Sequence, residues 1–324
     1  MKDQIHLTTG TANMTCRGFK RQEGAVIVVA LFFVALIAAM SYYMMSRLSS
    51  DTYRTHLLLR TAQAEYYAQG SVLWAIEQLR ANLRNQKPNK IVDKMPMESS
   101  DEINGYAISS KVTDMQSRLN LTNLNTAETQ IDFKHLMQLV DVKLEDKKAN
   151  EIMNAIVDWM KPGQTKNEYN QYYMSLSPPY RAAHRPFVSA SELQMVKGMT
   201  PELYMLLQPY ITTLPVATQV NVQTANGYVI ASLVPNMTVE TGKAIEKART
   251  NANIFSVAAF GNLDVVKNHK IPGAKITVVS QYFLLETIVK IEKQRLVIYT
   301  LLERSGNESK NAVKIVWQSK GIEA

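Results

Sequence analysis

The sequence predicts an α+β protein with a long N-terminal helix, strands from both halves of the chain and a large helical insert between those strands. Three observations predict this class. Residues 25–84 follow one continuous helical pattern that begins as an apolar run. Strand patterns occur at residues 105–113 and again after Pro272-Gly273. Between them, residues 126–268 have a mostly helical periodicity.

The first element is an apolar helix that is long enough to cross a membrane. Residues 25–46 carry no charged side chain, and about 20 apolar residues suffice to span a bilayer. The basic residues Arg17, Lys20 and Arg21 precede the run, which favours a cytoplasmic N-terminus. A secretory signal peptide is cleaved after its apolar region, whereas here the basic stretch ends at Gly24, before that region.

This basic stretch, with the apolar run directly after Gly24, resembles the leader of type IV pilins and type II secretion pseudopilins. The resemblance implies cleavage between Gly24 and Ala25, N-methylation of Ala25 and retention of the apolar helix. An uncleaved signal anchor is the alternative. Pilin-like subunits usually carry Glu at the fifth mature position, where this chain has Val29. Absence of that Glu resembles the K-type minor pseudopilin, which is placed at the filament tip.

The helical pattern continues beyond the apolar run and ends near Arg84–Pro88, because proline cannot continue a helix interior. Its apolar residues recur at spacings of three, four or seven, and Gly70 is an isolated weak point. An amphipathic face must be buried, and the pilin-like resemblance implies burial under an antiparallel sheet. The segment Thr61–Gly70 also resembles the K-type helix. The predicted face consists of Leu59, Ala62, Tyr66, Leu73, Ile76, Leu79 and Leu83.

The rest of the chain gives strand, helix and strand signals in turn. Strands are predicted at Gly105–Thr113, as a shorter extended piece at Arg118–Asn125, and as a three-stranded meander around Phe283–Ile291, Leu296–Leu302 and Val313–Trp317. Helices are predicted around Leu136–Leu144, at Ala149–Met160, after Thr200-Pro201 and at Val239–Ala248. Capping boxes are predicted for Asn125 with Glu128 and for Ser189 with Glu192, and Thr238 is expected to cap the last helix.

The helical insert carries the most specific resemblance. Residues 185–215 and 219–237 resemble the helical domain of the K-type subunit in the order and spacing of several motifs. The resemblance implies a pilin-like domain that a helical domain interrupts. The implied division is a leader at 1–24, a transmembrane part at 25–46, a first pilin-like part at 47–125, an inserted all-α domain at 126–272 and C-terminal strands at 273–324.

Composition and motifs argue against catalysis. The net charge of +8 falls to +6 without residues 1–24, and the single cysteine, Cys16, lies in that leader. The mature chain therefore has no disulfide. The sequence contains no Gly-x-Ser-x-Gly, no His-Glu-x-x-His and no phosphate-binding glycine loop, and its five histidines are scattered. We therefore expect a nonenzymatic protein.

The family resemblance raises calcium as a candidate ligand. K-type subunits are described with calcium held after an Asp-Trp segment, and Asp158-Trp159 matches that segment here. The loop that follows offers Glu168 and several amides, but also two lysines that repel a cation. Since Ca²⁺ takes six to eight oxygen ligands, Asp158 and Glu168 are calcium candidates, and the alternative is that both are solvated surface charges.

The resemblance implies a minor pseudopilin at the tip of the type II secretion pseudopilus, where it initiates or caps assembly for protein export. It would be anchored in the inner membrane by one helix, with its C-terminal domains in the periplasm. Implied partners are minor pseudopilins of the I and J types, the major pseudopilin, prepilin peptidase and the inner-membrane secretion platform. One alternative is a type IV minor pilin for adhesion or DNA uptake. The other is a membrane-anchored helix-hairpin-helix DNA-binding protein, although neither hairpin-like turn has the usual second glycine, so no nucleic acid is expected.

Overall fold

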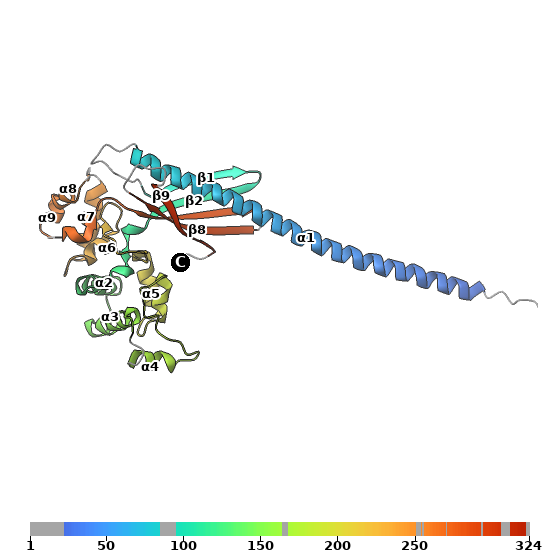
Figure 1. The fold of residues 1–324 in the computed structure, drawn as a ribbon, viewed down its shortest axis with the longest axis horizontal. Helices are drawn as coiled ribbons and strands as arrows, with labels where there is room; N and C mark the ends of the chain where they lie inside the picture. The colour runs from blue at the N-terminus through green and yellow to red at the C-terminus, as the bar shows by residue number, and fades with distance from the viewer. Residues whose placement is uncertain are drawn as a thin grey trace, which may run out of the picture. The chain divides into compact units, whose positions relative to one another are not determined.

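A computed structural model describes residues 23–84, 95–163, 168–250, 254, 256–269, 271–292, 294–305 and 312–321, with only the backbone given for residues 23, 24, 83 and 84. The chain divides into two compact units, one up to Arg60 and one from Thr61 onward. The first helix has residues in both units. The predicted α+β class is confirmed (Figure 1). The leader residues 1–22, which include Cys16, lie outside the described residues.

The α-helices are α1 (Glu23–Arg84), α2 (Ala127–Val140), α3 (Asp146–Met160), α4 (Glu168–Met174), α5 (Pro201–Leu207), α6 (Gly227–Ser232), α7 (Val239–Thr250), α8 (Val257–Gly261) and α9 (Asp264–Lys267). The 3₁₀ turns are η1 (Met115–Ser117), η2 (Leu121–Asn123), η3 (Ala190–Met195), η4 (Gln208–Tyr210) and η5 (Gly273–Lys275). The strands are β1 (Met97–Ile103), β2 (Tyr106–Asp114), β3 (Leu119–Asn120), β4 (Ile211–Thr212), β5 (Val220–Asn221), β6 (Ile276–Thr277), β7 (Tyr282–Ile291), β8 (Gln294–Arg304) and β9 (Val313–Lys320).

One five-stranded antiparallel sheet joins strands from the two ends of the second unit. Its order is β1-β2-β7-β8-β9. Strand β2 pairs with β7 in a register that places Val112 opposite Leu285, so the helical segment leaves the sheet after β2 and returns to it at β7. The predicted strand at 105–113 and the predicted meander are confirmed. Strand β1, which forms one edge, was not predicted, because its sequence Met-Glu-Ser-Ser-Asp-Glu-Ile has little apolar alternation.

The part of α1 from Thr61 to Arg84 packs on this sheet, but with a different face from the one predicted. Leu79 is fully buried as expected, whereas Tyr66 and Leu73 are 77% and 68% exposed. The residues that face the strands are mainly small, and small side chains let a helix approach a sheet closely. Ser71 is buried on this face. The buried apolar helix residues Ala64, Ala68, Val72, Ala75 and Leu79 pack with Val112, Phe283, Leu285, Val289, Ile298 and Leu302.

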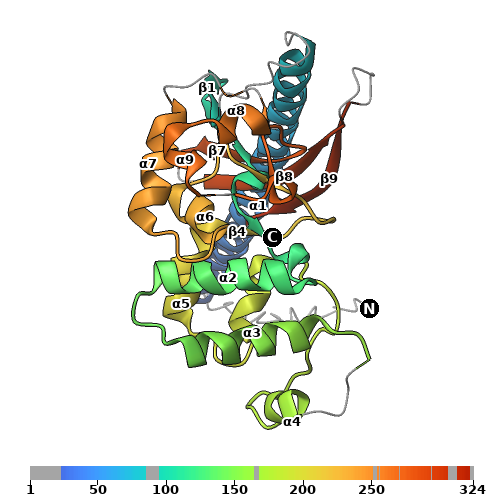
Figure 2. The ribbon, with the colours of Figure 1, turned by 90° about the vertical axis from the view of Figure 1, so that its left-hand side faces the viewer.

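The segment between β2 and β7 contains two apolar cores. Helices α2, α3 and α5 surround the first core, which includes Phe133, Ile156 and Leu207. Helices α6 to α9 surround the second, which includes Ile245 and Phe260. Figure 2 shows α2 above α3, with α4 at the far end of the segment from the sheet. This part of the chain is not entirely helical, since β3 pairs with β4 and β5 with β6 in short parallel ladders.

Three local predictions of helix starts are confirmed. Ser189 and Glu192 form both halves of a capping box at η3. Thr200 caps α5, whose first turn contains Pro201. At the start of α7, the hydroxyl of Thr238 accepts a hydrogen bond from the backbone N–H of Thr241 at 3.3 Å. Each cap pairs an amide that the helix itself leaves without a partner.

Three other local predictions are wrong in whole or in part. The cap of α2 is Thr126 rather than Asn125, because Thr126 has the extended backbone of a cap and its hydroxyl accepts from the amide of Thr129. The extended piece at 118–125 is confirmed only at β3, since the Asn120 side chain accepts from the Thr122 amide and closes the turn η2. The polar stretch after Gly163 contains α4. The division of the chain at 125/126 and 272/273 stays a prediction.

Candidate functional site

The first candidate site is the apolar part of α1. It is the one helix among the described residues that is long and apolar enough to cross a membrane. Every side chain from Ala25 to Leu59 is exposed. A helix that is apolar all round and that no other described residue covers is typical of a membrane span, so this helix anchors the chain in a membrane. Met40, Tyr42, Tyr43, Met44 and Met45 lie at its C-terminal end.

The predicted processing residues lie at the start of this helix. Gly24 and Ala25 belong to its first turn, and Val29 follows one turn later with an exposed side chain. The structure thus places these residues together, as their spacing requires. Cleavage between Gly24 and Ala25 and methylation of Ala25 stay predictions, because they concern chemistry that the unprocessed chain does not display.

The calcium candidates lie on two different helices. Asp158 is buried near the end of α3, and Glu168 is exposed at the first residue of α4. Both lie near Tyr169, whose phenol pKa is raised by burial first and then by the carboxylates of Glu168, Asp158 and Glu151. The structure therefore brings the two candidates into one neighbourhood, which the sequence could only suggest.

The described residues of this neighbourhood do not fit a calcium ion by themselves. In the part of the chain that the structure describes, no three acidic, histidine or cysteine side chains gather around a metal position. Two backbone oxygens of the described residues next to Asp158 already accept hydrogen bonds. The carbonyl of Trp159 accepts from the amide of His184 at 2.8 Å, and that of Lys161 accepts from Nδ1 of His184 at 3.0 Å. Nε2 of His184 in turn accepts from the side chain of Asn170 at 3.2 Å, so this histidine ties the loop together.

The two hairpin-like turns, at Val196–Met199 and Leu233–Met237, are packing features. Gly198 (φ +87°) and Asn236 (φ +64°) occupy the left-handed conformation at the two turns, as tight turns between helices require. After the second turn α7 packs against α6 so closely that a Cβ on Gly242 would overlap the carbonyl of Gly227. This contact indicates that the second turn serves the packing of α7 on α6.

A buried polar network joins the sheet to the helical segment. Asp114, at the end of β2, is 1% exposed. Its carboxylate accepts from the Gln116 amide at 2.8 Å, from Asn221 at 2.9 Å and from Ser280 at 2.6 Å, and it also accepts from Thr224. Burial raises the pKa of Asp114, while these hydrogen bonds act in the opposite direction. The network holds the points where the chain leaves and re-enters the sheet.

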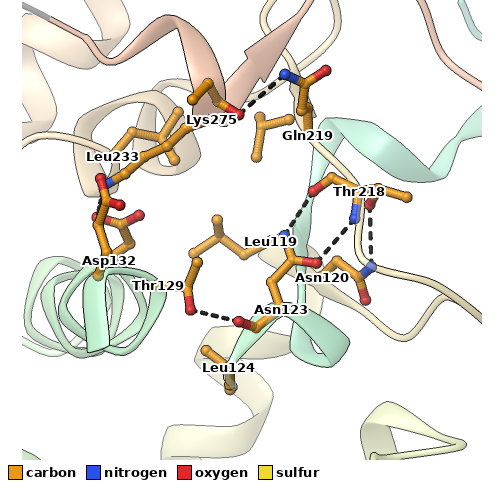
Figure 3. A pocket seen from close by; sticks show the side chains of 13 residues that line it. Leu119, Asn120, Asn123, Leu124, Thr129, Asp132, Thr218, Gln219, Leu233 and Lys275 are labelled. Carbon is orange, nitrogen blue, oxygen red and sulfur yellow. Dashed lines mark hydrogen bonds and ion pairs between the residues drawn. The ribbon is translucent and has the colours of Figure 1, made fainter. Parts of the chain in front are cut away.

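A cavity of about 170 Å³ lies between α2, β3 and η5 (Figure 3). On one side, Nζ of Lys275 bridges the carboxylates of Asp132, at 2.8 Å, and Glu128, at 3.1 Å. On the other side, Asn120 and Asn123 bond to backbone and side-chain atoms of residues 214–218. Because these polar groups form ion pairs and hydrogen bonds with one another or with the backbone, we interpret the cavity as a structural feature rather than a ligand site.

Sequence reasoning missed three of these features. Three of the four donors to the Asp114 carboxylate, and the Asp132 partner of Lys275, lie more than 100 positions away along the sequence. The outward face of α1, which Tyr66 and Leu73 mark, has an apolar signal in the sequence, but that signal was assigned to the buried face. Only the positions of the alanines could have shown which face meets the sheet.

Comparison with known proteins gives consistent results. Residues 117–216 match the family model described as type II secretion system (T2SS), protein K. The type II secretion system protein K of Pectobacterium carotovorum subsp. carotovorum is 24% identical over 309 residues, which cover 89% of this chain and 94% of the relative. The protein K of Pseudomonas aeruginosa is 26% identical over 303 residues, which cover 87% and 89% of the two chains.

A solved structure shares the fold. A chain in the crystal structure of the GspK-GspI-GspJ complex from the type 2 secretion system of enterotoxigenic Escherichia coli matches with a TM-score of 0.71. The match covers 83% of this chain and 100% of the other, at 20% identity. At this identity the likeness establishes the fold.

Proposed function

We propose that this chain, which belongs to the type II secretion system protein K family, is a minor pseudopilin that sits at the tip of the pseudopilus and initiates or caps its assembly. The observation that carries the proposal is the likeness to relatives named protein K along nearly their whole length. The shared order of membrane helix, sheet and helical segment supports the same reading.

The anchoring helix determines the location of the protein in the cell. One apolar helix holds the chain in a membrane. We propose that this is the bacterial inner membrane, with the N-terminus in the cytoplasm and residues after 46 in the periplasm. The basic residues before the helix support this orientation. A prepilin peptidase would cleave between Gly24 and Ala25 and leave Ala25 as the methylated terminus.

The partners follow from the same family. The fold neighbour was solved as a complex named for three subunits, GspK, GspI and GspJ. We propose that this chain likewise assembles with two pilin-like subunits of the I and J types, and through them with the major pseudopilin and the secretion platform. Val29, at the position where a pilin-like subunit usually has a glutamate, supports placement at the end of the filament. A subunit with no neighbour ahead of it needs no such carboxylate.

The proposed role is structural and nonenzymatic. The polar groups that line the cavity described above bond to other protein groups. The sequence also lacks the catalytic motifs named above. A large helical segment on one subunit also favours an end position, because a closely packed helical filament has little room for a repeated insertion. Secretion would draw its energy from elsewhere in the machinery.

Export from the host cell tests the proposal. Removal of the chain should leave exported proteins inside the periplasm, and return of the full chain should restore their appearance outside the cell. A matched control replaces the apolar segment 25–46 by a cleavable signal peptide, which delivers the same periplasmic part without its anchor and should not restore export. Normal export without the chain would refute the proposed function.

A further inference from the structure

The tripeptide Asn-Gly-Tyr occurs twice in this chain, at residues 104–106 and 226–228. An asparagine that precedes a glycine is prone to deamidation, because no Cβ hinders the approach of the glycine nitrogen to the side-chain carbonyl carbon of the asparagine. The two copies have the same reacting groups and the same residue after them. A difference in their reactivity in the folded chain therefore comes mainly from the structure around them.

The first copy lies at an exposed turn. Asn104 and Gly105 are the two residues that join the edge strand β1 to β2. Both are exposed, and both have a positive φ, 52° and 79°, as a type I′ hairpin turn requires. A Cβ on Gly105 would meet no atom within 4 Å. The side chain of Asn104 donates an exposed hydrogen bond from Nδ2 to the hydroxyl of Tyr67 at 2.9 Å.

The second copy is held at both of its reacting groups. The side-chain oxygen of Asn226 accepts from the Tyr228 amide at 3.0 Å and caps α6. The nitrogen that would attack belongs to Gly227, and its N–H donates to Oε2 of Glu246 at 2.7 Å. Gly227 is buried, and a Cβ on it would lie only 2.7 Å from the backbone nitrogen of Lys243. This backbone therefore has no room to rotate toward the asparagine side chain.

Arg249 holds the second copy further. Its guanidinium donates to the carbonyl of Ala225, the residue directly before Asn226. The same guanidinium forms an ion pair with Glu246 at 3.9 Å, so one cation fixes both the preceding residue and the carboxylate that accepts from the glycine N–H. Reaction at the second copy would therefore require the contact between α6 and α7 to open.

We propose that Asn104 is a site of spontaneous deamidation in the folded chain and that Asn226 is protected from it. The nitrogen of Gly105 attacks Cγ of Asn104, a C–N bond forms and closes a succinimide ring, and the Cγ–Nδ2 bond breaks. The leaving amide nitrogen takes the Gly105 amide proton and departs as ammonia. Water then opens the ring at either carbonyl and gives aspartate or isoaspartate. The turn must leave its left-handed conformation for the attack, and this opening costs little at an exposed tip on an edge strand.

Deamidation changes the hairpin between β1 and β2. Either product puts a carboxylate in place of the amide that donates to Tyr67, next to a strand that already carries Asp101 and Glu102. Isoaspartate also adds a methylene group to the backbone of the turn. Because turn geometry fixes the register of a hairpin, β1 loses pairing with β2 near the turn. The modification therefore weakens one edge of the sheet.

Peptide mapping by mass spectrometry tests this inference. The full chain in detergent is kept at physiological temperature in a mildly alkaline buffer, and conversion of amide to acid is followed at both copies. Asn104 should react at least about tenfold faster than Asn226, because the two sites differ in the cost of local opening. In urea the two rates should become similar, since the same tripeptide then reacts without the fold. Similar rates in the folded chain, or conversion of Asn104 only after unfolding, would overturn the inference.

Two variants test the protection of the second copy. Glu246→Ala removes the acceptor for the Gly227 N–H, and should raise the rate at Asn226 while the rate at Asn104 stays the same. Glu240→Ala, at an exposed position on the same helix, is the matched control and should change neither rate. Thermal scans show whether both variants fold, and the wild-type rates decide the inference if Glu246→Ala does not. An unchanged rate at Asn226 in a folded Glu246→Ala chain would overturn the assigned protection.

Hydrogen exchange tests the effect on the sheet. Chains that carry isoaspartate at position 104 are separated by chromatography from unmodified chains. The amides of β1 should exchange at least about tenfold faster in the modified chains, because its pairs with β2 open more often. Equal exchange in the two fractions would contradict the weakened edge.

Discussion

At the scale of single residues, the Asp114 carboxylate has four hydrogen-bond partners at the junction between the sheet and the helical segment. Four donors converge on a carboxylate that is 1% exposed. Asp114→Ala would leave these donors buried without their acceptor, and we expect a loss of about 2–4 kcal/mol in the free energy of unfolding. Urea denaturation measures it. Asp101→Ala, at an exposed position, is the control and should change stability by no more than about 0.5 kcal/mol.

Asp132 gives a prediction about pH. Burial raises the pKa of Asp132 from 3.8 to about 6 in spite of the ammonium of Lys275. Because the folded-state pKa is the higher one, protonation of this carboxyl favours the folded state. Its contribution to stability is fully present below about pH 4 and is lost as the pH rises through 6.

The variant Asp132→Asn removes this titration but keeps an oxygen for Lys275. The Tm of the variant relative to the wild type should therefore rise as the pH increases from about 4 to about 7. Thermal scans of both proteins in matched buffers measure the difference. Parallel Tm profiles across this range would contradict the burial argument for Asp132.

At the scale of elements, the orientation of α1 on the sheet is the main structural claim. Ala68 is 1% exposed against the strands, whereas Leu73 is 68% exposed. Ala68→Phe should overpack the interface and cost about 1–3 kcal/mol, while Leu73→Ala should cost no more than about 0.5 kcal/mol. Chemical denaturation of the full chain in detergent compares the two variants. A larger loss of stability for Leu73→Ala than for Ala68→Phe would show that the sheet covers the face that the sequence predicts.

The connection between α3 and α4 gives a prediction about metal. His184 ties this loop through the carbonyls of Trp159 and Lys161 and the side chain of Asn170. We therefore expect addition of a chelator to change the Tm by no more than about 1 °C, because removal of a metal lowers the Tm only where the folded chain binds it. A marked fall in Tm that added Ca²⁺ reverses would instead establish Asp158 and Glu168 as calcium ligands.

Sequence patterns predicted the elements better than their contacts. Helix α1, the strands at both ends and the caps at Ser189, Thr200 and Thr238 follow from local rules, since each depends on residues a few positions apart. The buried face of α1 does not. Apolar periodicity marks Tyr66 and Leu73 as well as Leu79, and the choice between faces depends on how closely the alanines allow the strands to approach. Apart from Gln116, the partners of Asp114 lie too far along the chain for any local pattern to reveal, and so do those of Lys275.

At the scale of the whole molecule, the chain combines parts that meet different surroundings. The apolar part of α1 is suited to lipid. The second unit contains the sheet, the soluble part of α1 and the helical segment with its two cores. On the outward face of the soluble part of α1, Tyr66 and Leu73 are 77% and 68% exposed. This combination is that of a membrane-anchored subunit that works by assembly.

The most direct test of this account is native mass spectrometry of the full chain, purified in detergent after co-production with the I-type and J-type pilin-like subunits of the same cell. The account predicts one complex that contains a single copy of each of the three chains. In that complex the mass of this chain should correspond to a polypeptide that begins at Ala25. Recovery of this chain alone, or only as a complex with itself, would contradict the central claim that it is an assembling minor pseudopilin.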